Sequence, residues 1–310
     1  MNIDSTMLVM IALSVISAAT PLIYAAIGEL VVEKSGVLNL GIEGMMLAGA
    51  VSGFGVGHLS GSSFLGVLAG IIAGMLLAML FAFLTLNLRT SQVATGLALT
   101  IFGIGLSALV GKSLIGIAYA GVPTYAVPFL SDLPVAGPLL FQHNLLVYGS
   151  VALVVLVSIF LKYTRAGLIL RAVGDSPESA HALGYPVMAV RYIATLFGGA
   201  CAGLAGCYLS MAYTPSWQEE MTAGRGWIAL ALVVFATWQP GRLIFGAYLF
   251  GGFTILQLHA QAMGINVPSQ LMSMLPYIAT IVVLVIISRD SGRIRKNAPA
   301  SIGQAFHPTK

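Results

Sequence analysis

The chain has 310 residues, of which 58% are hydrophobic and only 8% are charged, and its formal net charge is +4. Soluble domains carry about 25% charged residues. This composition therefore excludes a water-facing globular enzyme and gives no basis for a nucleic-acid partner. Long apolar runs recur, whereas the short alternating segments of a transmembrane barrel do not. The sequence predicts an all-α, polytopic transmembrane helical bundle that has the lipid bilayer as its solvent.

About nine spans are predicted, with eight to ten possible, and they follow one another in chain order at 7–27, 45–60, 64–86, 94–111, 144–161, 193–213, 227–239, 243–263 and 270–288. The first is interpreted as a retained span, because the residues before it include no lysine or arginine and so lack the basic start of a secretory signal. The second, fourth and seventh are short, glycine-rich or polar at one end. In transporters, such segments are typical of broken or re-entrant helices beside a substrate path.

Small residues at helical spacing predict close helix packing in the third and sixth spans. Gly66, Gly70 and Gly74 form one such series, and residues 198–203 form another. Cys201 and Cys207 are six residues apart, which is about 9 Å along a helix, so we expect no disulfide between them. The five histidines are scattered, and we therefore expect no metal site.

Lysine and arginine predict the orientation of the bundle. With nine spans, twelve of the fourteen basic residues fall on one side, which is then cytoplasmic. The N-terminus and the loops 112–143 and 214–226 are predicted to lie outside. The C-terminus and the loop 162–192 are predicted to lie inside. Residues 1–290 form a single permease-like domain in this interpretation, and residues 291–310 form a basic cytoplasmic tail that we expect to be mobile.

The cytoplasmic loop contains clear helix punctuation. Asp175 or Ser176 can cap an N-terminus, Pro177 suits the first turn, and Gly184 suits a C-terminal end. These signals predict a short helix at about 177–183. A short helix with small side chains can enter a groove on a partner protein. An ordinary connecting loop would show the same sequence features.

The run Arg171-Ala-Val-Gly-Asp-Ser-Pro-Glu-Ser-Ala-His-Ala-Leu-Gly184 resembles the coupling loop of ABC importer permeases. The resemblance is to the branched-chain amino acid, ribose and nucleoside group, and it covers about 20–290. It implies that this loop docks on a separate ATPase subunit. The residues matched to the motif are Arg171, Ala172, Gly174, Asp175, Pro177, Glu178, Ala180 and Gly184.

The stretch from Ser35 to Ala50 is most similar to the nucleoside type of this group, which is associated with basic membrane proteins. One departure is Phe235-Ala-Thr-Trp238, where relatives often have glycine after the phenylalanine. The resemblance implies a multi-pass protein of the bacterial plasma (inner) membrane. It also implies three partners: an ABC ATPase, a second related permease that makes a heterodimer, and an external solute-binding lipoprotein.

No cofactor is expected in this chain, because it lacks the glycine-rich nucleotide-binding loop. ATP and magnesium would be bound by the partner ATPase, so the chain is predicted to be a transport subunit and not an enzyme. The favoured solute is a nucleoside or purine. Simple sugars and branched-chain amino acids remain alternatives, and a secondary transporter, a channel or an intramembrane enzyme fits the sequence less well.

Polar and aromatic residues near the membrane-facing segments supply pathway candidates. Glu29, Glu33 and Glu43 follow the first span, and charge in lipid is costly. We expect Glu33 and Lys34 to be solvated, and Glu43 to act as a hinge, gate or pathway contact, or as a cap of the helix that follows it. The full set of pathway or gate candidates is Asn39, Glu43, Gln92, Thr95, Phe102 and Trp227.

Overall fold

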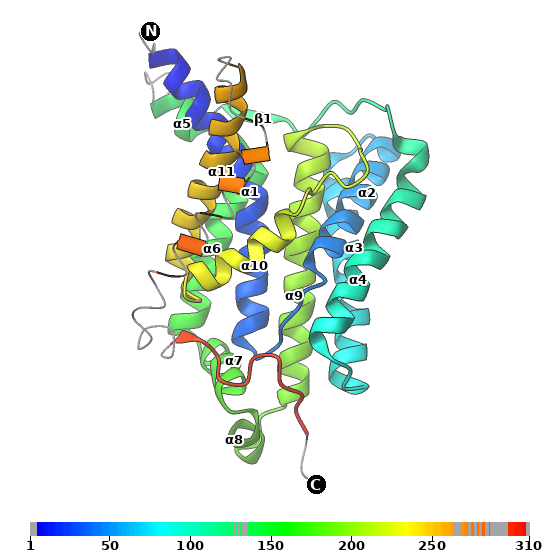
Figure 1. The fold of residues 1–310 in the computed structure, drawn as a ribbon, viewed down its shortest axis with the longest axis vertical. Helices are drawn as coiled ribbons and strands as arrows, with labels where there is room; N and C mark the ends of the chain where they lie inside the picture. Colours follow the sequence, from blue (N-terminus) through cyan, green and yellow to red (C-terminus); the bar gives the residue numbers. More distant parts are fainter. Residues whose placement is uncertain are drawn as a thin grey trace.

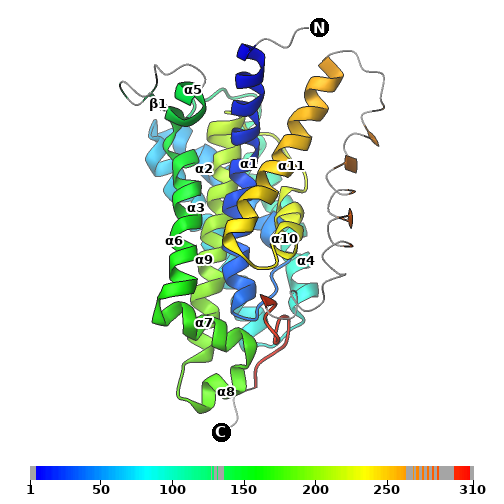
Figure 2. The same cartoon turned by 90° about the vertical axis from the view of Figure 1, so that its left-hand side faces the viewer.

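The computed structural model describes residues 5–126, 136–262 and 297–307, together with isolated positions between 128 and 131 and between 268 and 285. Most of these residues are helical, and the long helices run along one common direction (Figures 1 and 2). The first half contains α1 (Ser5–Lys34), α2 (Ile42–Ser60), α3 (Ser63–Ala82), the π-helical turn η1 (Phe83–Asn87), α4 (Gln92–Gly111) and η2 (Lys112–Leu114).

The second half begins with β1 (Thr124–Ala126), α5 (Ala136–Phe141) and β2 (Gln142–Asn144), and continues with α6 (Leu145–Tyr163), α7 (Arg165–Asp175), α8 (Pro177–Ala182), α9 (Val187–Tyr208), η3 (Leu209–Tyr213), α10 (Arg225–Phe235) and α11 (Pro240–Ala262). The strands β1 and β2 pair antiparallel, with Tyr125 opposite His143.

Six helical segments within the described ranges are long and apolar enough to cross a membrane, which confirms a helical membrane protein. They correspond to α1, α3 with η1, α4 with η2, α6, α9 with η3, and α11. The predicted second and seventh spans are helices too, α2 and α10, but they are not among these six. The ninth predicted span, 270–288, lies largely outside the described residues.

Helix α1 is longer than the sequence suggested, because it continues past residue 27 to Lys34. Glu29 and Glu33 therefore lie on the helix, and each is only 1% exposed. Their carboxylates accept hydrogen bonds from the backbone N–H of Asn39 (3.1 Å) and from the indole of Trp238 (2.6 Å), respectively. The expectation that Glu33 is solvated is thus wrong, because the indole of Trp238 replaces water at its carboxylate. At Glu29 only one carboxylate oxygen has a hydrogen-bond partner among the described residues.

The centre of the bundle is packed through small residues, as predicted. Gly74 of α3 lies directly against Gly199 and Gly203 of α9, so close that an added Cβ would collide with backbone atoms. Gly70 similarly meets Cys207 and the carbonyl of Gly49 on α2. Both cysteines are free and buried, which confirms that they are packing residues. The close approach of α2, α3 and α9 makes a rigid unit on which the functional segments are arranged.

Residues 35–41 form a non-helical segment that returns into the bundle. Its contacts move along α4: the N–H of Leu38 donates to Gln92 at the helix start (2.7 Å), and the carbonyl of Leu40 accepts from Thr100 two turns further along (3.0 Å). Gly44 then meets Gly103. The eleven-residue step from Gln92 to Gly103 corresponds to roughly 16 Å along α4. Helix α2 therefore begins part-way along the bundle, as Figure 1 also shows.

The two loops predicted to be external contact each other. Isolated bridges join Ile115 to Trp217 and Ala118 to Ser216, so residues after α4 pair with residues after α9. Trp217 is 1% exposed and packs with Phe54 of α2. These contacts join the segments that follow α4 and η3 at the end of the bundle opposite α7 and α8 (Figure 1).

Candidate functional site

Helices α7 and α8 form the end of the molecule that the sequence assigns to the cytoplasm. The predicted helix near 177–183 is confirmed as α8, with Ser176 as its N-cap and Pro177 in its first turn. Gly184 follows the helix with a φ of 84°, a conformation that glycine adopts without strain. Helix α7 was not predicted, although Thr164 is a recognisable N-cap that accepts a hydrogen bond from the N–H of Gly167 at 3.0 Å.

The residues of the coupling-loop motif divide between two faces. Gly174, Pro177 and Ala180 are buried, and Ala180 packs with Val173 and Val187. Ala172, Asp175, Glu178 and Gly184 are exposed, and Arg171 is half-buried. Next to them, Leu183 is 77% exposed and has no cover within the described part of the chain. The motif thus combines an inward anchor with an outward surface suited to a partner.

Residues 297–307 pack against this end of the bundle. Their contacts run from α1 to the turn after η1: the ammonium of Lys34 donates to the carbonyl of Asn297 (2.5 Å), and Arg89 lies 3.1 Å from His307. Phe306 is buried against α8, with its ring 5.6 Å from that of His181. The expectation of a mobile tail is therefore wrong for these residues. They provide a backbone acceptor for Lys34 at the end of α1 and an apolar side chain, Phe306, that packs against α7 and α8.

Arg191 of α9 ties the tail to the rest of the bundle and is completely buried. Its guanidinium donates to the carbonyl of Ser35 (3.2 Å), to the carbonyl of Gln304 (3.1 Å) and to the hydroxyl of Ser301 (3.1 Å). Ser301 in turn donates to the carbonyl of Gly174 on α7 (2.7 Å). One planar side chain thus connects the α1–α2 segment, the tail and the coupling loop. Sequence analysis placed Arg191 only among the cytoplasmic basic residues and missed this role.

Glu43, at the start of α2, binds the N-terminus of α10. Its carboxylate accepts hydrogen bonds from the hydroxyl of Thr222 (2.5 Å) and from the N–H groups of Gly224 (2.8 Å) and Gly226 (2.5 Å). The side chain is 5% exposed, and Gly226 leaves room for it because a Cβ there would collide with Glu43. Glu43 therefore caps α10 through hydrogen bonds that the sequence did not indicate. It also lies in the first turn of α2, so it is near the positive dipole end of both helices, as expected for its own helix.

The other predicted pathway residues do not gather around Glu43 as one site. The side chain of Asn39 caps the turn before α2, since it accepts from the N–H of Gly41 (2.9 Å). Gln92 is buried, and its side-chain oxygen accepts a hydrogen bond from the N–H of Leu38. Thr95 pairs with Thr90 at 2.8 Å, whereas Phe102 is half-exposed on α4 and Trp227 is half-buried on α10. Most of these polar groups satisfy the ends of broken helices.

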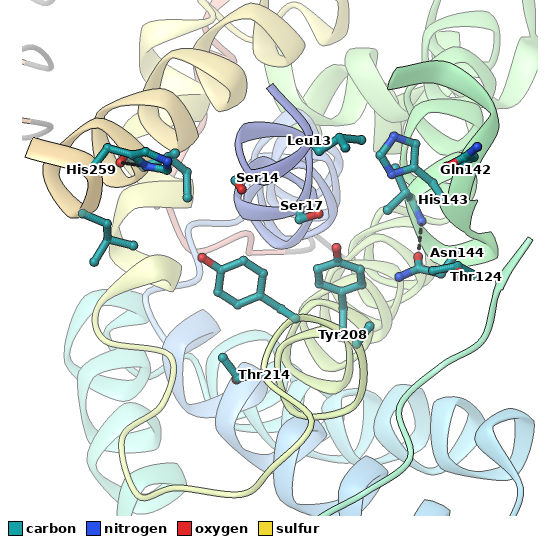
Figure 3. A pocket seen from close by; sticks show the side chains of 15 residues that line it. Leu13, Ser14, Ser17, Thr124, Gln142, His143, Asn144, Tyr208, Thr214 and His259 are labelled. Atoms are coloured by element: carbon teal, nitrogen blue, oxygen red, sulfur yellow. Dashed lines mark hydrogen bonds between the residues drawn. The ribbon is translucent and has the colours of Figure 1, made fainter. Parts of the chain in front are cut away.

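A cavity of about 610 Å³ with both polar and apolar lining residues lies at the end of the bundle near the start of α1. Figure 3 shows Ser14 and Ser17 of α1, Tyr208 of α9 and Asn144 around this space, with His143 and His259 on opposite sides. The complete lining among the described residues is Leu13, Ser14, Ser17, Thr124, Gln142, His143, Asn144, Val147, Tyr208, Ala212, Tyr213, Thr214, Ile255, Leu258 and His259.

The cavity lining is rich in hydroxyl, amide and imidazole groups. It includes no aspartate, glutamate, lysine or arginine among the described residues. Such a surface can donate and accept hydrogen bonds without offering a fixed charge. Sequence analysis missed the cavity, because its residues come from five separate segments that hydropathy treats as ordinary spans and loops.

Comparison with known proteins decides the family. The family model described as branched-chain amino acid transport system / permease component matches residues 11–284. The chain belongs to this family. It is 40% identical to a putative glucose ABC transporter permease of Haloferax volcanii, with 94% of this chain and 95% of that protein covered.

Two further relatives are named for nucleosides. The permease is 32% identical to a nucleoside ABC transporter permease of Lactococcus lactis, with 92% of this chain and 93% of that protein covered. It is 31% identical to a guanosine ABC transporter permease of Bacillus subtilis, over 86% of this chain and 88% of that protein. Membership and the apolar helices make the permease a multi-pass plasma-membrane subunit of an ABC transporter, a class that works with ATPase and binding-protein partners.

Proposed function

We propose that this permease translocates a neutral solute rich in hydroxyl and amide groups, most specifically a nucleoside or purine. The cavity described above carries the proposal, because its lining combines many hydrogen-bonding groups with no fixed charge among the described residues. The cavity lies near the start of α1, and the proposed orientation, with the N-terminus outside, would open it to the external side.

A branched-chain amino acid is a poorer fit to this surface. Its ammonium and carboxylate would lose water on entering the cavity, and each would need an opposite charge or several donors or acceptors in return. The serine, threonine, tyrosine and amide groups instead match the hydroxyls of a sugar ring. We therefore infer that the cavity discriminates by the absence of charge partners as well as by its hydrogen bonds.

A nucleoside adds a flat base to the sugar ring, and the partly exposed ring of Tyr213 in the lining offers a surface for it. Stacking of a base on an aromatic ring contributes about 1–3 kcal/mol. Two relatives named for nucleoside and guanosine transport support this choice. A simple sugar is the second candidate, favoured by the relative named as a putative glucose permease.

We further propose that the exposed face of α7 and α8 docks on the ATPase. Leu183 and the small residues beside it are exposed, whereas Ala180 and Phe306 anchor α8 from the inside. A second related permease would complete the pathway, and an external binding lipoprotein would deliver the solute.

Solute choice is tested by ATP-driven uptake of labelled guanosine into proteoliposomes that contain the complete transporter. Unlabelled guanosine should compete fully, glucose weakly or not at all, and leucine not at all. Replacing Ser17 with phenylalanine should obstruct the cavity and abolish uptake. The matched variant V155F adds the same ring to an exposed position on α6 and should transport normally. Full competition by leucine would refute a neutral-solute site.

ATPase docking is tested by co-purification after gentle solubilisation. The variant L183D should lose the ATPase, since it places a charge on the proposed contact surface. The variant L59D is the control. Leu59 is 83% exposed and lies at the C-terminal end of α2, on the side of the bundle opposite α8. If both variants retain the ATPase equally, α8 is not its docking surface.

A further inference from the structure

A second cavity lies between the lower ends of α1, α6, α7 and α11, on the same end of the bundle as α8. Its volume is about 410 Å³, and four basic residues line it: Lys34, Lys162, Arg171 and Arg242. They come from four different helices or helix ends, so folding brings together charges that are far apart in the sequence. Figure 1 shows the lower ends of α6 and α11 side by side above α7.

The positive charge of this cavity is only partly compensated. Among the described residues, none of the four basic side chains forms a salt bridge with a carboxylate at hydrogen-bonding distance. Lys34 donates to the carbonyl of Asn297, and Arg242 donates to the hydroxyl of Thr237 at 2.9 Å. Asp175 lines an adjoining cavity of about 250 Å³ with Lys34 and Arg171, and Glu33 is held by Trp238. The cations thus outnumber the nearby carboxylates.

Arg171 provides a second, independent indication that this cavity binds a ligand. Its Nε–H is buried, yet it has no hydrogen-bond acceptor within the described part of the chain. The ammonium of Lys34 is attracted by Asp175 and, more weakly, repelled by Arg171. A buried donor without an acceptor is costly, and a bound oxyanion would supply that acceptor.

The surroundings of the cavity indicate what carries that oxyanion. Leu161, Trp238 and Pro240 give the cavity an apolar side, and Leu168 of the adjoining cavity is exposed. A basic pocket between membrane helices on the cytoplasmic side is the arrangement that receives anionic lipid headgroups. A cavity of this size is large enough for a glycerophosphate group.

We propose that this cavity, here called the basic cavity, binds a phosphate group at the cytoplasmic membrane surface, as presented by an anionic phospholipid. The phosphate oxygens accept hydrogen bonds from Arg171 and from the lysine and arginine side chains around it. Because Arg171 belongs to α7 and Lys34 ends α1, the bound phosphate links the coupling loop to α1, the helix that precedes the non-helical segment 35–41.

The test measures the thermal stability of the purified permease with added phosphatidylglycerol, phosphatidylcholine or inorganic phosphate. Saturating phosphatidylglycerol at about 100 times its Kd should stabilise the protein by several degrees, whereas phosphatidylcholine should not. Stabilisation by inorganic phosphate alone at similar concentration would assign the cavity to a free anion. The double variant K162Q/R242Q should lose most of the lipid effect, because it removes two cations without touching the coupling-loop motif.

The matched control is R165Q, which removes a basic residue from the start of α7 that does not line the basic cavity. It should keep the full response to phosphatidylglycerol. An equal response of wild type, K162Q/R242Q and R165Q, or an equal response to phosphatidylcholine, would overturn the proposal. Solute uptake is not needed for this readout, so the result is independent of the function proposed above.

Discussion

The Glu43 carboxylate allows the clearest quantitative prediction, because its three donors and its position at the α10 N-terminus are all defined. Replacing Glu43 with glutamine keeps the shape of the side chain but changes one accepting oxygen into an NH₂ group. That group would face N–H or O–H donors, so at least one charge-assisted hydrogen bond is lost. Loss of such a bond costs about 1.5–3 kcal/mol.

Loss of the charge also removes its attraction to the helix dipole, which is worth about 0.3–1 kcal/mol. Together these terms predict that E43Q is destabilised by roughly 2–4 kcal/mol. Unfolding entropy is about 2.1 cal/mol/K per residue, so for a chain of 310 residues each kcal/mol shifts the melting temperature by about 1.5 °C. We therefore expect the melting temperature of the detergent-solubilised permease to fall by about 3–6 °C.

The assay is thermal unfolding monitored by cysteine reactivity, since Cys201 and Cys207 are buried and become accessible only when the bundle opens. The control is E219Q, which makes the same chemical change at an exposed glutamate in the segment between η3 and α10. That variant should change stability by no more than about 0.5 kcal/mol. An E43Q protein as stable as wild type would refute the capping argument.

Three further predictions concern packing, the α8 cap and the tail. The variant G203L should prevent α3 from approaching α9 and greatly reduce the folded yield, measured by size-exclusion chromatography, whereas G252L should be tolerated because nothing lies within 4 Å of that position. Loss of the N-cap in S176A should weaken α8 by about 0.5–2 kcal/mol and raise the concentration of ATPase needed for half-maximal binding; unchanged binding would contradict a role for the cap. The variant F306A should release the tail and speed hydrogen exchange in α8, while Q304A should not, because Gln304 contributes its backbone carbonyl to Arg191.

Local signals in the sequence were sufficient for several features. Helix α8 was predicted because Ser176, Pro177 and Gly184 act on their own neighbours. The glycine series of α3 was recognised because its spacing repeats along one face, and the structure confirms it as a packing face. The family was also recognisable, because its motif occupies one continuous stretch.

Features that depend on distant partners could not be predicted in the same way. Glu43 finds its donors about 180 positions later in the chain, and Arg191 joins segments that are more than 100 positions away on either side. The end of α1 was placed too early because Glu29 and Glu33 resemble interfacial residues, and only the fold shows that Asn39 and Trp238 donate hydrogen bonds to them. The cavity near the start of α1 could not be predicted for the same reason, since five segments contribute to it.

The central claim is that the permease moves a neutral solute with energy from a separate ATPase. Its most direct test is guanosine uptake into proteoliposomes containing the permease, its ATPase, its partner permease and the binding protein. The account predicts uptake that requires ATP, stops when the ATPase is omitted, and is lost in S17F but not in V155F. Uptake that continues without the ATPase, or that leucine inhibits as strongly as unlabelled guanosine, would contradict it.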